Sequence, residues 1–301
     1  MQSNEIIVVD SIPKDSYIRI VEKSLKYALI SQPFTINRMG IDSIENKVLN
    51  ITKGKIAEGI FEFFCNSNDI QVNFKSCETP FWTIDKRDFI FDGLEWDIKN
   101  NFFYSEKDVE IDCSTLPALI PNRHPKDQWS KRNKSEILQS NGIAYVFTFM
   151  KMANIQNGKR TESFIEIDIP ENCLRFLDKK NFKYLGQPQK THPQKYEEEF
   201  NTIFSTQAIK DIYKINSQPN LFITGYATQE DWIKFKDTGK NAPNNFIDFL
   251  PNDWYRVNKT GSITFLNNVL TATIKNATLP VSYLRPFSKL LLKRSFRYSS
   301  F

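Results

Sequence analysis

Two aspartates and a lysine lie close together in the segment Lys86–Lys99, which reads KRDFIFDGLEWDIK. The acidic residues are Asp88 and Asp97, and Lys99 follows Asp97 by two positions. Carboxylate oxygens are hard ligands, of the kind that Mg²⁺ takes while it keeps several waters for a substrate phosphate. A nearby ammonium group can orient or deprotonate a metal-bound water. These residue types indicate metal-assisted hydrolysis of a phosphodiester, provided that the fold brings them together.

The sequence between the two aspartates predicts the element that positions them. Asp92-Gly93 separates two β-rich runs and is a strong hairpin signal, because both central residues of a type I′ turn need positive φ. Across a two-residue turn the numbers of facing residues have a constant sum, so Asp88 is expected to face Asp97. One face of the hairpin would be apolar, and the other would carry Lys99 beside Asp97.

Two facing carboxylates need compensation, because like charges destabilise an antiparallel pair of strands. A divalent cation held between them would supply it. The alternative is a solvated outer face on which Asp88 and Asp97 each pair with Lys86 or Lys99. Both interpretations remain open on the spacing alone.

Helical and strand periodicities alternate around this hairpin. Amphipathic helices are predicted over Lys14–Ile30, Ser43–Ile51, Thr52–Asn66 and Pro125–Gln139. Strands are predicted over Ile70–Lys75, Lys86–Phe91, Leu94–Lys99 and Ile143–Met150. Further patterns predict strands at Ser163–Ile169 and Leu221–Tyr226, helices at Glu171–Leu177 and Tyr196–Ile215, and a hairpin about Asn267-Asn268. The predicted fold class is therefore mixed α/β, with a central mixed sheet, flanking helices and a C-terminal α+β elaboration.

The element order and the pattern D-x₈-D-x-K from Asp88 to Lys99 resemble the PD-(D/E)XK nuclease superfamily, which includes many type II restriction endonucleases. The resemblance covers about residues 50–150 and implies a core in the order αβββαβ. Two positions depart from the family pattern. Arg87 stands where the motif has proline, and Asp97 replaces the commoner glutamate.

The resemblance also implies roles for individual residues. Asp88 and Asp97 would hold the metal together with the main-chain carbonyl of Ile98, and Lys99 would assist the chemistry. An additional glutamate often projects toward the metal from the preceding helix. Glu58 is similar to that residue, and Glu62, one turn later, is its rival.

Positive charge is concentrated at the carboxyl end. The chain has a formal net charge of +5, and residues 254–301 contribute +8 with no acidic residue, so residues 1–253 carry −3. A basic end on a mildly acidic body indicates a polyanionic partner, while a solvated basic tail is the alternative. The basic residues that we expect at DNA phosphates are Arg123, Lys126, Lys131, Arg132, Lys134, Arg285, Lys289 and Arg294.

Several classes of function are disfavoured. The four cysteines are scattered and there are only two histidines, which is a poor inventory for a zinc site. The sequence has no P-loop, no G-x-G-x-x-G and no G-x-S-x-G. The longest apolar stretches fall short of a membrane span, and no secretory signal is recognisable, so we expect a cytoplasmic protein without a membrane partner.

The leading hypothesis is a Mg²⁺-dependent endonuclease for double-stranded DNA, of the restriction type, with Mn²⁺ as a possible substitute. A homodimer is expected, because paired cuts and symmetric sites suit two-fold symmetry. Residues 1–150 would hold the N-terminal helices and the nuclease core. Residues 151–301 would add DNA recognition and association surfaces, either as a second unit or within the same domain. The alternatives are a repair or phage-defence nuclease acting on ends or branched DNA, and a non-catalytic DNA-binding protein.

Overall fold

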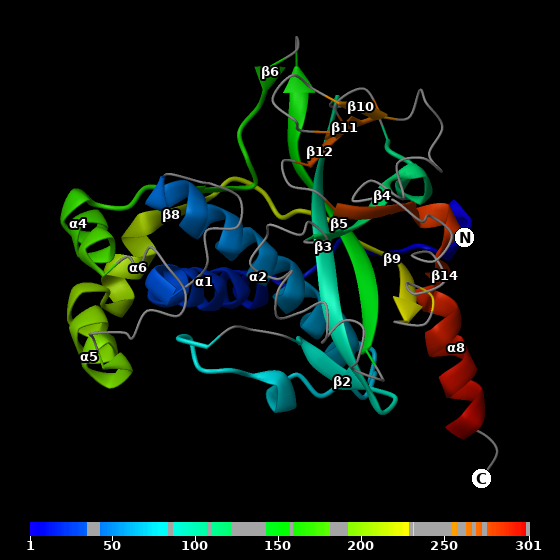
Figure 1. Ribbon diagram of the computed structural model, residues 1–301, viewed down its shortest axis with the longest axis horizontal. Coiled ribbons are helices and arrows are strands. Elements are labelled where there is room, and N and C mark those ends of the chain that lie inside the picture. The colour runs from blue at the N-terminus through cyan, green and yellow to red at the C-terminus, as the bar shows by residue number, and fades with distance from the viewer. Residues whose placement is uncertain are drawn as a thin grey trace, which may run out of the picture.

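The computed structural model describes most of the chain in segments. The described residues are 1–34, 43–83, 87–106, 110–121, 143–156, 159–180, 192–228, 231, 255–257, 263–266, 269–272 and 276–298. Helices and strands alternate along them, and they assemble around one main sheet (Figure 1).

The main sheet is mixed, as the sequence predicts. Its strands lie in the order β1 (Ile7–Val9), β9 (Leu221–Thr228), β5 (Ile143–Gln156), β3 (Leu94–Glu106) and β2 (Phe89–Phe91). β14 (Arg285–Pro286) pairs with β9, and β6 (Lys159–Arg160) pairs with β5. β3 and β5 are parallel, whereas β2 with β3, β5 with β9 and β1 with β9 are antiparallel. The mixed α/β class is therefore confirmed.

Smaller elements flank this sheet. The described helices are α1 (Lys14–Ser31), α2 (Ile44–Ser67), α4 (Glu171–Lys179), α5 (Pro193–Ile203), α6 (Thr206–Ile212) and α8 (Phe287–Tyr298). The remaining described strands form three small sheets: β4 (Pro117–Pro121) with β13 (Asn276–Pro280), β7 (Ile165–Ile167) with β8 (Tyr213–Ile215), and β10 (Tyr255–Val257) with β11 (Ile263–Phe265) and β12 (Leu270–Ala272). Among the described residues, no helix is long and apolar enough to cross a membrane.

Apolar side chains cover both faces of the main sheet. On one face, Trp96 and Ile98 of β3 pack in a cluster with Ile56 and Ile60 of α2 and with Phe287 at the start of α8. The other face carries a second cluster. This cluster contains Phe103 of β3, Tyr145, Phe147 and Phe149 of β5, and residues of β4, β12 and β13. Because side chains alternate along a strand, neighbouring residues of β3 enter different clusters.

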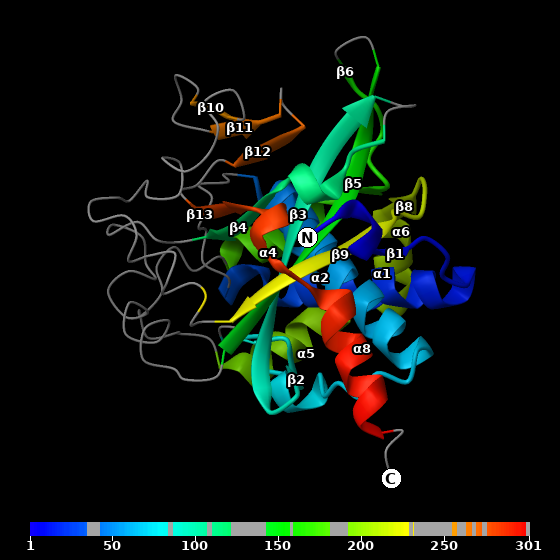
Figure 2. The ribbon, with the colours of Figure 1, turned by 90° about the vertical axis from the view of Figure 1, so that its right-hand side faces the viewer.

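The N-terminal residues contact the start of α8, the last described helix. The hydroxyl of Ser288 in α8 donates to the main-chain oxygen of Glu5 (2.7 Å), and Lys289 forms an ion pair with Glu5. Figure 2 shows α8 beginning close to the N-terminus. Since β9 lies between β1 and β5, residues before and after position 150 share one sheet.

Two sequence-based predictions near the site are wrong. The helices expected over Ser43–Ile51 and Thr52–Asn66 are one continuous helix, α2, which Ser43 caps by accepting from the N–H of Asn46 (3.3 Å). The strand expected over Ile70–Lys75 is absent apart from a single bridge between Asn73 and Ile90. Its alternating residues Ile70, Val72 and Phe74 pack on the first core cluster instead, so burial replaces strand pairing there.

Other elements match more closely. α1 begins at Lys14 as predicted. The register of β11 with β12 is centred on Asn267-Asn268, which confirms that hairpin. The predicted helix Tyr196–Ile215 is instead α5, α6 and β8, because Ser205 caps a new helix by accepting from the N–H of Ala208 (3.2 Å). The predicted helix Pro125–Gln139 lies outside the described residues, so the αβββαβ order stays a prediction.

Candidate active site

The Asp92-Gly93 turn forms as the sequence predicts. Both residues have positive φ, 57° at Asp92 and 71° at Gly93. The ladder pairs Phe89 with Trp96 and Phe91 with Leu94. The two-residue turn is therefore confirmed, and so is the predicted register from the turn as far as the pair of Phe89 and Trp96.

Asp88 occupies the end of this ladder. Its main-chain N–H donates to the oxygen of Trp96 (2.8 Å), and its Oδ2 accepts from the N–H of Ile98 (2.5 Å). The described ladder ends at Phe89 and Trp96, so Asp88 and Asp97 do not form the regular facing pair that the arithmetic predicts. Instead, the carboxylate of Asp88 lies against the main chain one residue after Asp97. This arrangement avoids two carboxylates facing each other directly.

Asp97 and Lys99 lie on one face of β3, as predicted. Lys99 Nζ donates to Oδ2 of Asp97 (2.5 Å) and lies 5.8 Å from the ring centroid of Tyr145. Tyr145 belongs to the second core cluster, so the pair projects from the face opposite Trp96 and Ile98. The side chains of Asp97 and Lys99 are 18% and 22% exposed, which leaves part of each accessible to a ligand.

Glu58 lies on α2, which packs on the face that carries Trp96 and Ile98. Its Oε2 accepts from Lys55 Nζ (2.5 Å), one turn away on the same helix. Glu58 therefore approaches Asp88 from the α2 side, whereas Asp97 and Lys99 project from the other face. Asp88 directly precedes β2; it lines a pocket with Glu58 and accepts a hydrogen bond from the main chain of Ile98, between Asp97 and Lys99.

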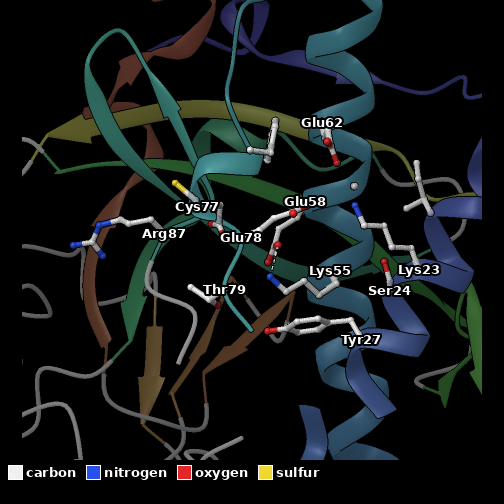
Figure 3. A pocket seen from close by; sticks show the side chains of 14 residues that line it. Lys23, Ser24, Tyr27, Lys55, Glu58, Glu62, Cys77, Glu78, Thr79 and Arg87 are labelled. Carbon is white, nitrogen blue, oxygen red and sulfur yellow. Dashed lines mark hydrogen bonds and ion pairs between the residues drawn. The ribbon is translucent and has the colours of Figure 1, made fainter. Parts of the chain in front are cut away.

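A pocket of about 280 Å³ joins Glu58 and Asp88. It lies between α1, α2 and the segment 74–79, and the start of the hairpin closes it through Arg87 and Asp88. Figure 3 shows Lys55 of α2 and Tyr27 of α1 extending toward the segment that carries Glu78 and Thr79. Glu62, the rival of Glu58, lines the same pocket.

The carboxylate of Asp88 and the main chain of Ile98 bring two kinds of oxygen atom to the same edge of β3. In a strand, the N–H and C=O of one residue point to the same neighbour, so the carbonyl of Ile98 points toward the side on which its N–H meets Asp88. The carboxylates of Asp88 and Asp97 and the carbonyl of Ile98 would then be the candidate ligands of a magnesium ion, which would keep several bound waters. No group of three or more His, Cys, Asp or Glu that could hold a metal ion occurs within the described segments. A metal here would therefore depend on this smaller set of ligands.

The basic residues expected at DNA are described only in part. Arg123, Lys126, Lys131, Arg132 and Lys134 lie outside the described residues, and the side chain of Arg294 in α8 is also outside them. Arg285 forms an ion pair with Asp231 and lies 4.8 Å from the ring centroid of Tyr226. Lys289 pairs with Glu5. The charges of these two residues are thus compensated within the chain.

The pocket contains polar residues that the sequence analysis missed. Lys23 and Tyr27 of α1 belong to it, together with Lys55, Glu78 and Thr79. The i,i+3 spacing of Lys55 and Glu58 is a signal that the sequence does carry. Glu78 and Thr79 have no comparable signal, because they follow a single turn of 3₁₀ helix (Lys75–Cys77) whose position depends on the tertiary fold.

We compared the chain with known proteins by family, by sequence and by structure. No protein-family model, no curated protein and no solved structure matches this chain.

Proposed function

We propose that this protein is a Mg²⁺-dependent nuclease that hydrolyses phosphodiester bonds of double-stranded DNA, most simply as an endonuclease of the restriction type. One observation carries the proposal. The carboxylate of Asp88 meets the main chain at Ile98, between the acidic Asp97 and the basic Lys99. An anion, a carbonyl and a cation thus occupy three consecutive positions of β3, and a second anion, Asp88, lies against the middle one.

Each residue has a distinct part in this proposal. Asp88 and Asp97, with the carbonyl of Ile98, would hold the metal, and Glu58 would contribute from α2 directly or through a water. A bound Mg²⁺ would lower the pKa of a water and neutralise charge on the phosphate. Lys99 would leave its ion pair with Asp97 to orient the attacking water or to stabilise the charge that develops on the phosphorus oxygens.

Association with DNA would depend on the basic residues of the chain. The excess of basic residues after position 253 supports a polyanionic partner. Because Arg285 and Lys289 form ion pairs within the chain, we assign the main phosphate contacts to the basic residues between Arg123 and Lys134. A homodimer would allow both strands of a symmetric site to be cut.

The proposal is tested by incubating the protein with supercoiled plasmid and with linear duplex DNA, in Mg²⁺, Mn²⁺ or Ca²⁺. We expect conversion of the plasmid to nicked and linear forms in Mg²⁺ and Mn²⁺, and binding without cleavage in Ca²⁺. Discrete bands would support a site-specific endonuclease. Shortening of linear DNA alone would instead favour an enzyme that acts on ends. Binding without any cleavage would favour a non-catalytic protein whose Asp97–Lys99 pair is only structural.

A further inference from the structure

Glu58 already has a cationic partner in the structure. Its Oε2 accepts a hydrogen bond from Nζ of Lys55 at 2.5 Å, and the two side chains are 26% and 21% exposed. Residues three positions apart are neighbours on the surface of a helix, so the spacing in α2 allows this pair to form locally. Both residues also line the pocket that contains Asp88. The pair therefore lies at the wall of the pocket and not on the open surface of the helix.

A second helix fixes the position of this ammonium group. Lys55 Nζ lies 4.9 Å from the centroid of the ring of Tyr27, which belongs to α1. Figure 3 shows the amine between the carboxylate of Glu58 and this ring. The face of an aromatic ring attracts a cation, and the attraction increases where water is partly excluded. Lys55 would thus keep one favourable contact if its ion pair with Glu58 were broken.

The same arrangement occurs at Asp97. Lys99 Nζ donates to Oδ2 of Asp97 at 2.5 Å and lies 5.8 Å from the centroid of the Tyr145 ring. Glu58 and Asp97 come from different elements, α2 and β3, and each pairs with a lysine of its own element. Two of the carboxylates that we propose as metal ligands are therefore neutralised by an ammonium group that lies near a tyrosine ring.

We propose that Lys55 is an internal counter-ion of Glu58, which a metal ion must displace. The inference rests on the proposed function, in which Glu58 is a ligand of the metal. Where only a fraction of a protein is competent to bind, the apparent affinity falls by that fraction. The ion pair would thus neutralise Glu58 in the metal-free protein and weaken metal binding. On displacement, the ammonium group of Lys55 would remain over the ring of Tyr27.

The test measures the affinity of the full chain for Mn²⁺ in the absence of DNA, so that it does not depend on cleavage. The electron paramagnetic resonance signal of unbound Mn²⁺ gives the dissociation constant. Lys55→Met and Lys55→Gln remove the charge with an apolar and a polar side chain, while Lys55→Arg retains the charge. Lys23→Met is the matched control, because Lys23 lines the same pocket and makes no ion pair with the described residues.

We expect both neutral variants of Lys55 to bind Mn²⁺ roughly two- to fivefold more tightly than the wild type, as expected from the loss of one partly exposed ion pair. Neither Lys55→Arg nor Lys23→Met should tighten binding measurably. The gain should disappear when Glu58→Gln is added to both the wild type and Lys55→Met, because such a double-mutant cycle isolates the interaction of the two residues.

Unchanged or weaker Mn²⁺ binding by the neutral variants of Lys55 would overturn the inference even if the protein cuts DNA. Equal tightening by Lys23→Met, or a gain that persists with Glu58→Gln, would overturn it as well, because the effect would then come from charge in general. So would the absence of Mn²⁺ binding in the wild type and in Lys55→Met. The predicted tightening in a protein that fails to cut DNA would keep the counter-ion and contradict the proposed function.

Discussion

The carboxylate of Asp88 has a structural role as well as a chemical one. It accepts from the N–H of Ile98, in the position where a continued β2 would offer a carbonyl. Asparagine keeps an acceptor oxygen there, whereas alanine leaves the N–H of a buried residue without this partner. Activity lost in Asp88→Ala would therefore combine two effects, and Asp88→Asn separates them.

We predict that Asp88→Ala lowers the free energy of unfolding by about 1–3 kcal/mol and that Asp88→Asn lowers it by clearly less. Urea denaturation followed by tryptophan fluorescence measures both variants. Equal destabilisation by alanine and asparagine would contradict the assigned role of the hydrogen bond to Ile98.

Lys53 of α2 has an unusual environment. It is only 2% exposed, and burial lowers the pKa of its amine from an ordinary value near 10.5 to about 8. Between these two pH values the unfolded chain binds more protons than the folded chain. The contribution of Lys53 to the free energy of unfolding therefore rises as the pH increases from about 8 to about 10.5.

Replacement of Lys53 by methionine should remove that dependence. At pH 7 we expect Lys53→Met to be more stable than the wild type by on the order of 2 kcal/mol, and the difference should shrink as the pH approaches 10.5. Burial also raises the thiol pKa of Cys65 and of Cys113 to about 12. Both thiols are present in the variant and in the wild type, so their effect on the pH dependence cancels in the difference. Urea unfolding at pH 7 and pH 10 gives the comparison. A difference that is independent of pH would refute the role assigned to Lys53.

At the scale of elements, the β2–β3 hairpin determines where the candidate site residues lie. Gly93 has φ of 71°, a conformation that alanine adopts only with strain. Gly54 of α2 offers a matched comparison, because an added Cβ there meets nothing within 4 Å in a helix interior. The same chemical change should thus have opposite effects at these two positions.

We predict that Gly93→Ala destabilises the protein by about 1 kcal/mol, while Gly54→Ala stabilises it by about 0.5–1 kcal/mol. Thermal unfolding monitored by circular dichroism measures both. Destabilisation by Gly54→Ala would contradict the open space that surrounds this position of α2. An unchanged unfolding temperature in Gly93→Ala would contradict the positive φ at the turn.

Local chemistry explains which elements could be predicted from the sequence. The turn at Asp92-Gly93 depends on two adjacent residues, and the register then follows, so the position of Asp88 against β3 was predictable to within one residue. The conformation of the segment with Ile70, Val72 and Phe74 could not be predicted. An alternating pattern of apolar residues is equally compatible with pairing in a sheet and with packing on α2. The pocket could not be predicted, since its walls come from α1, α2 and the segment around the short 3₁₀ helix Lys75–Cys77, which come together only through tertiary packing.

At the scale of the whole molecule, the two halves of the chain depend on each other. β9 pairs with both β5 and β1, and Phe287 of α8 contacts the rings of Phe61 and Trp96. Each face of the main sheet is also covered partly by residues after position 156. Without them, β5 would expose an unpaired edge and apolar surface on both faces.

We therefore expect a fragment of residues 1–156 not to fold alone, although it holds all the proposed catalytic residues. Its circular dichroism should show no cooperative thermal transition, and its NMR amide signals should be poorly dispersed, in contrast to the full chain. A fragment that is well dispersed and unfolds cooperatively would contradict the shared sheet as the basis of stability.

Catalysis as proposed requires Asp88 and Asp97 to act together on a cation. The most direct measurement is the rate of Mg²⁺-dependent cleavage of supercoiled DNA by Asp88→Asn and Asp97→Asn, compared with the wild type and with Glu106→Gln. Glu106 is an exposed acid at the end of the same strand and serves as the control. We predict that each aspartate variant, folded as judged by circular dichroism, loses at least about 100-fold in rate, equivalent to roughly 2.7 kcal/mol, while Glu106→Gln cuts at the wild-type rate. Wild-type cleavage by either aspartate variant would contradict the account.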